Sequence, residues 1–128
     1  MRLLLDTCTF LWMATGDAAL SVAARAAITD PGNEVWLSTV SAAEIAVKHR
    51  LGRLRLSEPP ERLVPRVREA HGVAALALGE AAALGLGRLP ELHRDPFDRL
   101  LIAQALAEGL VVVTPDEAIR GYPVRTLW

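Results

Sequence analysis

Four acidic residues, Asp6, Glu44, Asp98 and Asp116, lie next to the ends of predicted strands or helices. Carboxylates that converge repel one another, and the arrangement is costly unless a cation compensates for it. A hard divalent cation that prefers oxygen ligands, such as Mg2+ or Mn2+, supplies that compensation. Such an ion can also bind a phosphate and activate a water molecule. If the four acids converge, they indicate metal-dependent hydrolysis of a phosphate ester.

The segments that carry these acids alternate between strand and helix. Strands are predicted over residues 2–6, 35–37, 73–78, 110–114 and 124–127. Helices are predicted over residues 20–28, 41–51, 59–70, 80–84 and 96–108, with residues 85–94 as a loop. This order predicts one α/β domain over residues 1–128, with a parallel sheet between two layers of helices. Functional groups of such sheets gather beyond the carboxyl ends of the strands, where Asp6, Glu44 and Asp116 are expected. Asp98 joins them if its helix begins at that edge.

Most of these acids also have a purely structural interpretation. Ser41 and Glu44 have the spacing of a capping box, in which Glu44 would only stabilise the start of a helix. Asp98 and Asp116 stand where an acid near a helix start is favourable. Asp6 has no capping role in the predicted structure, so we expect a function for it.

Composition limits the class of protein. The chain has 128 residues, 52% hydrophobic and 23% charged, which is typical of a globular domain. Its net charge of -1 argues against a protein that binds nucleic acid by charge alone, although a bound metal can itself hold phosphate. The single cysteine, Cys8, and the lack of a long apolar run favour a cytoplasmic protein without a membrane span, and the first residues are not expected to be a signal peptide. The absence of CxxC and HExxH patterns argues against zinc.

Four segments of the sequence match a known family in order. Residues 3–7 (LLLDT), 41–45 (SAAEI), 93–105 (HRDPFDRLLIAQA) and 113–116 (VTPD) resemble the motifs of PIN-domain ribonucleases, and most closely those of the VapC-like toxins of bacterial toxin–antitoxin pairs. The third segment is long and specific, whereas the first and last would be weak alone. The resemblance implies a PIN-like α/β/α sandwich and an endoribonuclease that depends on Mg2+ or Mn2+. It implies that the acidic cluster consists of Asp6, Glu44, Asp98 and Asp116.

The resemblance also implies neighbours for the cluster and partners for the protein. Thr114 is similar to the hydroxyl residue that the family places beside the metal, and Asp95 either supports the ligands or caps a helix. The family implies a homodimer, an RNA substrate and a cognate antitoxin that blocks the site. Arg94 and Arg99 flank the acids and are candidate phosphate contacts.

We expect Asp6, Asp98 and Asp116 to hold the metal, with Glu44 as a further ligand or as the group that orients the attacking water. Two alternatives are binding modules. A receiver-like signalling domain also gathers acids around magnesium, but it needs a lysine after a late strand, and the only lysine, Lys48, lies in a predicted helix. The second alternative is a PIN fold that serves only for association with other proteins. A nuclease assay distinguishes this alternative from the enzyme.

Overall fold

The computed structural model describes residues 1–128 and contains a five-stranded sheet in which every strand is parallel to its neighbours. The strand order is β3-β2-β1-β4-β5, which places β1 at the centre. The strands are β1 (Arg2–Leu5), β2 (Glu34–Ser38), β3 (Ala74–Leu76), β4 (Val111–Val113) and β5 (Thr126–Leu127). The buried residues of β1, Leu3 to Leu5, and all of β4 are apolar because helices cover both faces of the sheet.

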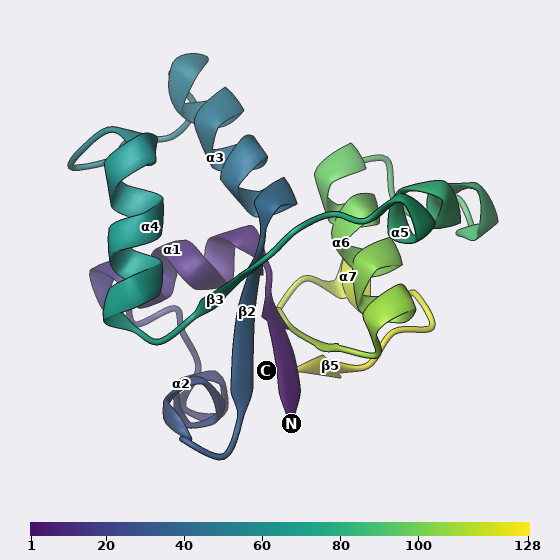
Figure 1. Ribbon diagram of the computed structural model, residues 1–128, viewed down its shortest axis with the longest axis horizontal. Helices are drawn as coiled ribbons and strands as arrows, with labels where there is room; N and C mark the ends of the chain where they lie inside the picture. The colour runs from purple at the N-terminus through teal and green to yellow at the C-terminus, as the bar shows by residue number, and fades with distance from the viewer.

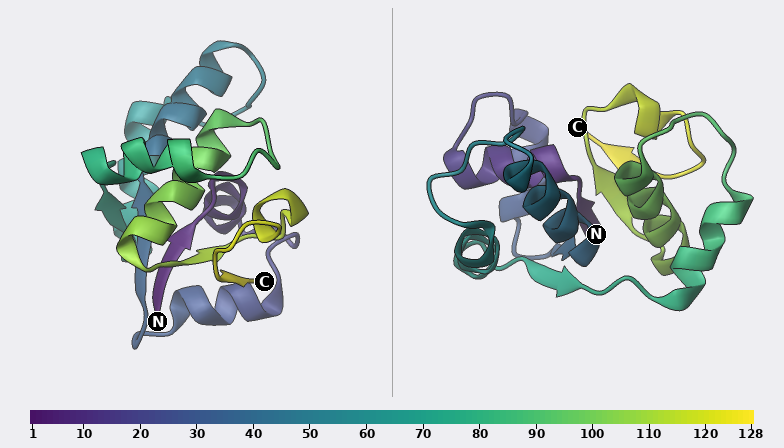
Figure 2. Two further views of the ribbon diagram at one scale, coloured as in Figure 1. Left: turned by 90° about the vertical axis from the view of Figure 1, so that its right-hand side faces the viewer. Right: turned by 90° about the horizontal axis from the view of Figure 1, so that it is seen from above.

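Helices form a layer on each side of the sheet, as the sequence predicted (Figures 1 and 2). One layer contains α1 (Thr7–Thr15), α2 (Val22–Thr29), α3 (Thr39–Arg50) and α4 (Pro60–Ala70). The other contains α5 (Glu80–Leu84), the 3-10 helix η1 (Gly85–Arg88), α6 (Pro96–Glu108) and α7 (Glu117–Arg120).

Alternate side chains of β1 point into two separate cores. Leu3 and Leu5 pack in the core beneath α1, α2, α3 and α4, and Leu4 packs in the core beneath α6 and α7. This alternation is the period of two that a strand imposes on its side chains. The two cores lie on opposite faces of the sheet, and each is covered by helices. This arrangement confirms the predicted α/β/α sandwich.

The structure differs from the sequence-based prediction at several helices. Helix α1 was not predicted, and it begins directly after Asp6. Helix α3 begins at Thr39 with Ser38 as its N-cap, two residues before the predicted start. Part of the predicted loop over residues 85–94 is the 3-10 helix η1. None of the helices has the length and apolar character that crossing a membrane requires.

Candidate metal centre

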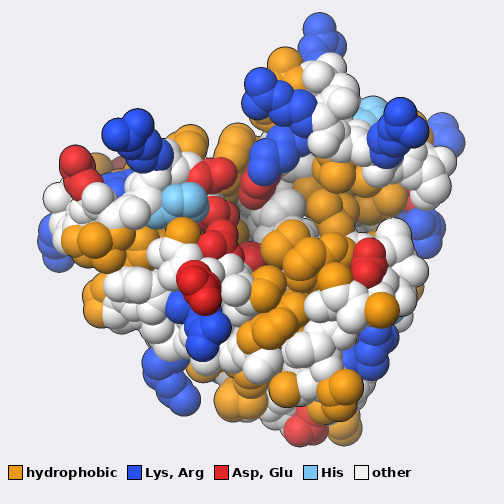
Figure 3. All heavy atoms as spheres, turned by 180° about the vertical axis from the view of Figure 1, so that it is seen from behind, with side chains coloured by type: hydrophobic (Ala, Val, Ile, Leu, Met, Phe, Trp, Pro, Cys, Tyr) orange, Lys and Arg blue, Asp and Glu red, His pale blue; other side chains and the backbone are white.

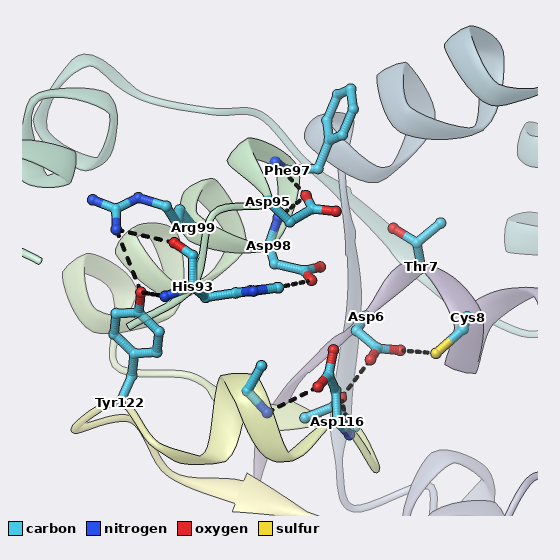
Figure 4. Close-up of polar contacts among 12 residues, drawn as sticks. Asp6, Thr7, Cys8, His93, Asp95, Phe97, Asp98, Arg99, Asp116 and Tyr122 are labelled. Carbon is cyan, nitrogen blue, oxygen red and sulfur yellow. Dashed lines mark hydrogen bonds and ion pairs between the residues drawn. The ribbon is translucent and has the colours of Figure 1, made fainter. Parts of the chain in front are cut away.

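The carboxyl edge of the sheet carries the candidate residues (Figure 4). Asp6 follows β1, Thr114 follows β4 directly, and Asp116 comes two residues later. Glu44 lies on α3, the helix that begins at the carboxyl end of β2. Asp98 lies in the first turn of α6. The parallel sheet therefore brings residues from four separate parts of the sequence to one edge.

Asp6 is buried at the junction of β1 and α1. Its Oδ1 accepts hydrogen bonds from the backbone N–H of Thr9 at 2.8 Å and from the Cys8 thiol at 3.3 Å. Asp6 is thus the N-cap of α1, and the expectation that it has no capping role is wrong. The reason is that α1 starts immediately after the strand and exposes its first N–H groups to this carboxylate.

Thr114 connects Asp6 to Asp116. Its hydroxyl donates a hydrogen bond to Asp6 Oδ2 and accepts one from the backbone N–H of Asp116 at 3.0 Å. The side chain of Asp116 also caps α7, since its Oδ1 accepts from the N–H of Ala118 at 2.9 Å. The second oxygen of Asp116 remains free of hydrogen bonds within the protein. Thr114 therefore lies between two of the acids.

Asp98 faces the same space and contacts His93, a residue that the sequence analysis did not select. The two side chains meet at 2.8 Å between His93 Nε2 and Asp98 Oδ2. Asp95 caps α6, because its Oδ1 accepts from the N–H groups of Phe97 and Asp98, so the capping interpretation of Asp95 is confirmed. A histidine in a predicted loop gives no sequence signal of its own, and only the path of that loop brings it to the acids.

Glu44 is almost fully buried, and each of its two oxygens has a partner. Thr7 donates to Oε1 at 2.6 Å, and Lys48 forms an ion pair with Oε2. Thr7 Oγ also lies 3.0 Å from the hydroxyl of Ser41. Because α3 begins at Thr39, Glu44 lies beyond the first turn, and the predicted capping box with Ser41 does not form. Its burial therefore has no explanation in helix capping.

The electrostatics show how closely the acids approach. Burial, together with the nearby carboxylates of Asp95 and Glu44, raises the pKa of Asp98 from its ordinary value of 3.8 to about 6, although the hydrogen bond from His93 acts in the opposite direction. The hydrogen bond to Glu44 raises the pKa of Lys48, which keeps this lysine charged. Lys48 pairs with Glu44 alone, so it does not balance the negative charge of all the acids in the cluster.

A group of three side chains has the spacing of a metal site. One potential ligand atom from each of His93, Asp98 and Asp116 lies within 4.8 Å of the other two. Asp6 and Glu44 are outside this group, although Thr114 joins Asp6 to Asp116. In the space-filling view, acidic side chains and a histidine border a recess on this face of the molecule (Figure 3). An oxygen-rich donor set with one imidazole suits a divalent cation of the magnesium or manganese type.

The two arginines that flank the acids differ in their surroundings. The guanidinium of Arg99 points away from the acids (Figure 4) and donates to the carbonyl oxygens of Pro90, His93 and Leu86 at 3.2 to 3.4 Å and to the hydroxyl of Tyr122 at 3.4 Å. Arg99 thus holds the loop before α6. Arg94 is exposed and free of side-chain hydrogen bonds.

Comparison with solved structures shows the same fold over essentially the whole chain. A chain of the VapBC2 complex of Rickettsia felis, bound to a promoter DNA fragment, has a TM-score of 0.75 at 14% identity, covering 99% of this chain and 98% of that one. A chain of DNA-bound VapBC from Salmonella typhimurium has a TM-score of 0.68 at 19% identity, covering 99% and 97%. A chain of VapBC-1 from nontypeable Haemophilus influenzae has a TM-score of 0.65 at 18% identity, also covering 99% and 97%.

A search of curated proteins finds no match. The PIN domain model matches residues 3–124, a range that contains β2, β3, β4, most of β1 and all four predicted acids. The parallel sheet and the two helical layers agree with that match. This chain belongs to the PIN domain family.

Proposed function

We propose that this protein is an endoribonuclease that hydrolyses RNA phosphodiester bonds with Mg2+ or Mn2+ as its cofactor, and that residues 1–128 act as one domain. The observation that carries the proposal is the approach of Asp98 and Asp116 at the carboxyl edge of the sheet, with His93 beside them. The raised pKa of Asp98, about 6, agrees with this proposal, because perturbed carboxyl groups are common in functional sites.

In this proposal, Asp98 and Asp116 hold the ion, and Asp6 contributes a third carboxylate directly or through water. When bound, the ion stabilises charge on the phosphate and lowers the pKa of the attacking water. Glu44 serves as a further ligand or orients that water. Thr7 and Lys48 fix both of its oxygens and so set the direction of the carboxylate.

The distribution of basic residues supports a nucleic-acid substrate despite the net charge of -1. Seven of the 14 lysines and arginines lie between residues 48 and 68, a stretch with only two acids, and we call it the basic segment. Four of its arginines are exposed and have no acidic partner: Arg50, Arg53, Arg55 and Arg62. The segment begins one helical turn beyond Glu44, so these charges can attract an RNA backbone towards the acids.

We further propose that the protein is the toxin of a toxin–antitoxin pair, acts as a homodimer in the cytoplasm and is blocked by its antitoxin. The shared fold with VapBC chains supports this role. A mostly apolar groove of about 430 Å³ between α1 and residues 54–57 also supports a protein partner. Trp12 and Leu56 line it, and Cys8, at one end, contacts Asp6. A segment bound in this groove would lie beside the acids.

A cleavage assay tests the nuclease. The purified protein should cut RNA with Mg2+ or Mn2+, and EDTA should stop the reaction. Asp98→Asn and Asp116→Asn should each reduce cleavage by about a hundredfold or more, the scale of losing a group that stabilises the transition state. Asp17→Asn is the matched control, because Asp17 is an exposed acid whose only side-chain hydrogen bond, to the N–H of Ala19, survives in asparagine. Full cleavage by all three variants would refute the proposed centre.

A growth assay tests the biological role separately. Expression of this chain alone should arrest growth, and co-expression with the protein encoded beside it should restore growth and yield a stable complex. Asp98→Asn should be harmless but should still bind that protein. A wild-type chain that cuts RNA but neither arrests growth nor binds its neighbour would leave the nuclease intact and exclude the toxin.

A further inference from the structure

His93 is the one side chain of the three-residue group with Asp98 and Asp116 that is not an acid. It lies in the loop before α6, and its ring reaches Asp98 at 2.8 Å (Figure 4). About a quarter of the side chain is exposed, so the ring is accessible from solvent. The other two histidines, His49 and His71, are both exposed.

The backbone of His93 is held from two sides. Its N–H donates to the hydroxyl of the buried Tyr122 at 3.0 Å, and its carbonyl oxygen accepts from Arg99 at 3.4 Å. Arg99 also lies 3.4 Å from the same Tyr122 hydroxyl, which closes a small network behind the ring. A side chain fixed by such a supporting network is suited to hold a ligand in one geometry.

The spacing of His93 and Asp98 matches neighbouring positions around one ion, and a carboxylate oxygen of Asp116 lies within 4.8 Å of both. For metal–ligand bonds of about 2.1 Å in an octahedron, adjacent ligand atoms lie about 3 Å apart and opposite ones about 4 Å apart. His93 Nε2 and Asp98 Oδ2 are 2.8 Å apart, and the group that includes Asp116 spans at most 4.8 Å. The cation would take the place of the proton between Nε2 and Oδ2, leaving a neutral imidazole with its remaining proton on Nδ1.

We propose that His93 is a nitrogen ligand of the metal ion that Asp98 and Asp116 hold. The inference rests on the proposed function and adds to it a choice of metal. Imidazole nitrogen binds Mn2+ and later transition ions better than Mg2+, which favours oxygen. The site should therefore discriminate in favour of Mn2+ more strongly than carboxylates alone would.

Pulsed electron paramagnetic resonance of the Mn2+-loaded protein tests direct ligation. Because Mn2+ is paramagnetic, a directly bound imidazole nitrogen gives a characteristic coupling in the spin-echo envelope. We expect this coupling in the wild type and in His71→Gln, and we expect His93→Gln to lose it. Glutamine at this position can still donate a hydrogen bond to Asp98, so the variant removes the ligand nitrogen but retains the positioning contact.

Calorimetric titration of the same proteins with Mn2+ and with Mg2+ tests the preference. His93→Gln should weaken Mn2+ binding by about tenfold or more, since the loss of a residue that only supports a metal ligand already reduces metal affinity by about that factor. Mg2+ binding should weaken less, so the ratio of the two affinities should fall. Absence of nitrogen coupling in the wild type, or an unchanged ratio in His93→Gln, would overturn the inference.

The two proposals can fail separately. RNA cleavage by a Mn2+-loaded wild type without nitrogen coupling would retain the nuclease and reject His93 as a ligand. Nitrogen coupling in a protein that binds Mn2+ but cuts no RNA would retain the ligand and reject the nuclease. A wild type that binds no Mn2+ would reject His93 as a ligand, and the cleavage assay with Mg2+ would still decide the nuclease.

Discussion

The hydroxyl of Thr114 donates a hydrogen bond to the carboxylate of Asp6, across 108 positions of sequence. It joins the carboxyl ends of the neighbouring strands β1 and β4, and it also accepts the N–H of Asp116. Both Thr114 and Asp6 are buried, so neither partner has water as a substitute. This contact combines a structural role with the placing of two candidate metal ligands.

Replacement of Thr114 tests the structural half of that role. Thr114→Val keeps the shape but leaves a buried carboxylate with one donor fewer and the Asp116 N–H without its acceptor. Hydrogen bonds to charged groups contribute about 1.5 to 3 kcal/mol, and we expect a loss of that size in the free energy of unfolding. Urea denaturation in EDTA measures it. Thr114→Ser retains the hydroxyl and should lose less, and equal stability of the wild type and the valine variant would contradict the prediction.

The raised pKa of Asp98 predicts a pH dependence of stability in the metal-free protein. Because the folded-state pKa is about 6 and the ordinary value is 3.8, the folded state binds more protons between these values. This contribution to stability is therefore present near pH 4 and is lost as the pH rises through 6. Its size is roughly 2 to 3 kcal/mol.

Asp98→Asn lacks this titration, so it should gain stability relative to the wild type between pH 4 and pH 7. Denaturation of both proteins in EDTA across this range measures the difference, in which the titrating groups that do not contact Asp98 largely cancel. A difference that stays constant with pH would show that Asp98 is not perturbed.

Burial and the carboxylate of Asp6 raise the pKa of the Cys8 thiol. The thiolate is the reactive form, so we expect iodoacetamide at pH 8 to alkylate Cys8 in the folded protein at least about tenfold more slowly than in urea. Mass spectrometry of timed samples gives both rates. Equal rates would mean that the thiol neither donates to Asp6 nor is shielded in the groove.

Much of the site follows from the sequence because strand ends in a parallel sheet share an edge. Asp6, Glu44 and Asp116 could be placed there before any coordinates, and Asp98 required only that its helix begin at that edge. Helix α1 was missed because its threonines and aromatic residues favour strands as much as helices. Packing of Phe10 against the core decides the outcome.

The rest of the site depends on contacts between distant segments. The capping interpretation of Glu44 is wrong because α3 begins at Thr39, two residues before the predicted start. No local sequence pattern specifies a helix start to within two residues. His93 is fixed by Tyr122, which lies 29 positions away. Side chains on loops that tertiary contacts hold cannot be located from periodicity or capping rules.

The basic segment predicts how salt affects RNA binding. Asp98→Asn provides a background in which binding can be measured without cleavage. A single-stranded RNA bound through phosphate contacts loses affinity with salt at a logarithmic slope of about 0.7 per contact. Arg53 and Arg55 are exposed in this segment and have no acidic partner. Removing both as Arg53→Ala/Arg55→Ala should lower the magnitude of that slope by about 1 to 1.5.

The control removes the same charge from the opposite edge of the sheet. Arg25, on α2, and Arg125, just before β5, are exposed and lie away from the carboxyl ends of the strands. Arg25→Ala/Arg125→Ala changes the net charge equally, so a general loss of attraction would affect both double variants alike. Fluorescence anisotropy of a labelled RNA over a range of NaCl concentrations gives each slope. If RNA binds along the basic segment, Arg53→Ala/Arg55→Ala reduces the magnitude of the slope and Arg25→Ala/Arg125→Ala does not. Equal slopes in the two double variants would show that RNA binds elsewhere.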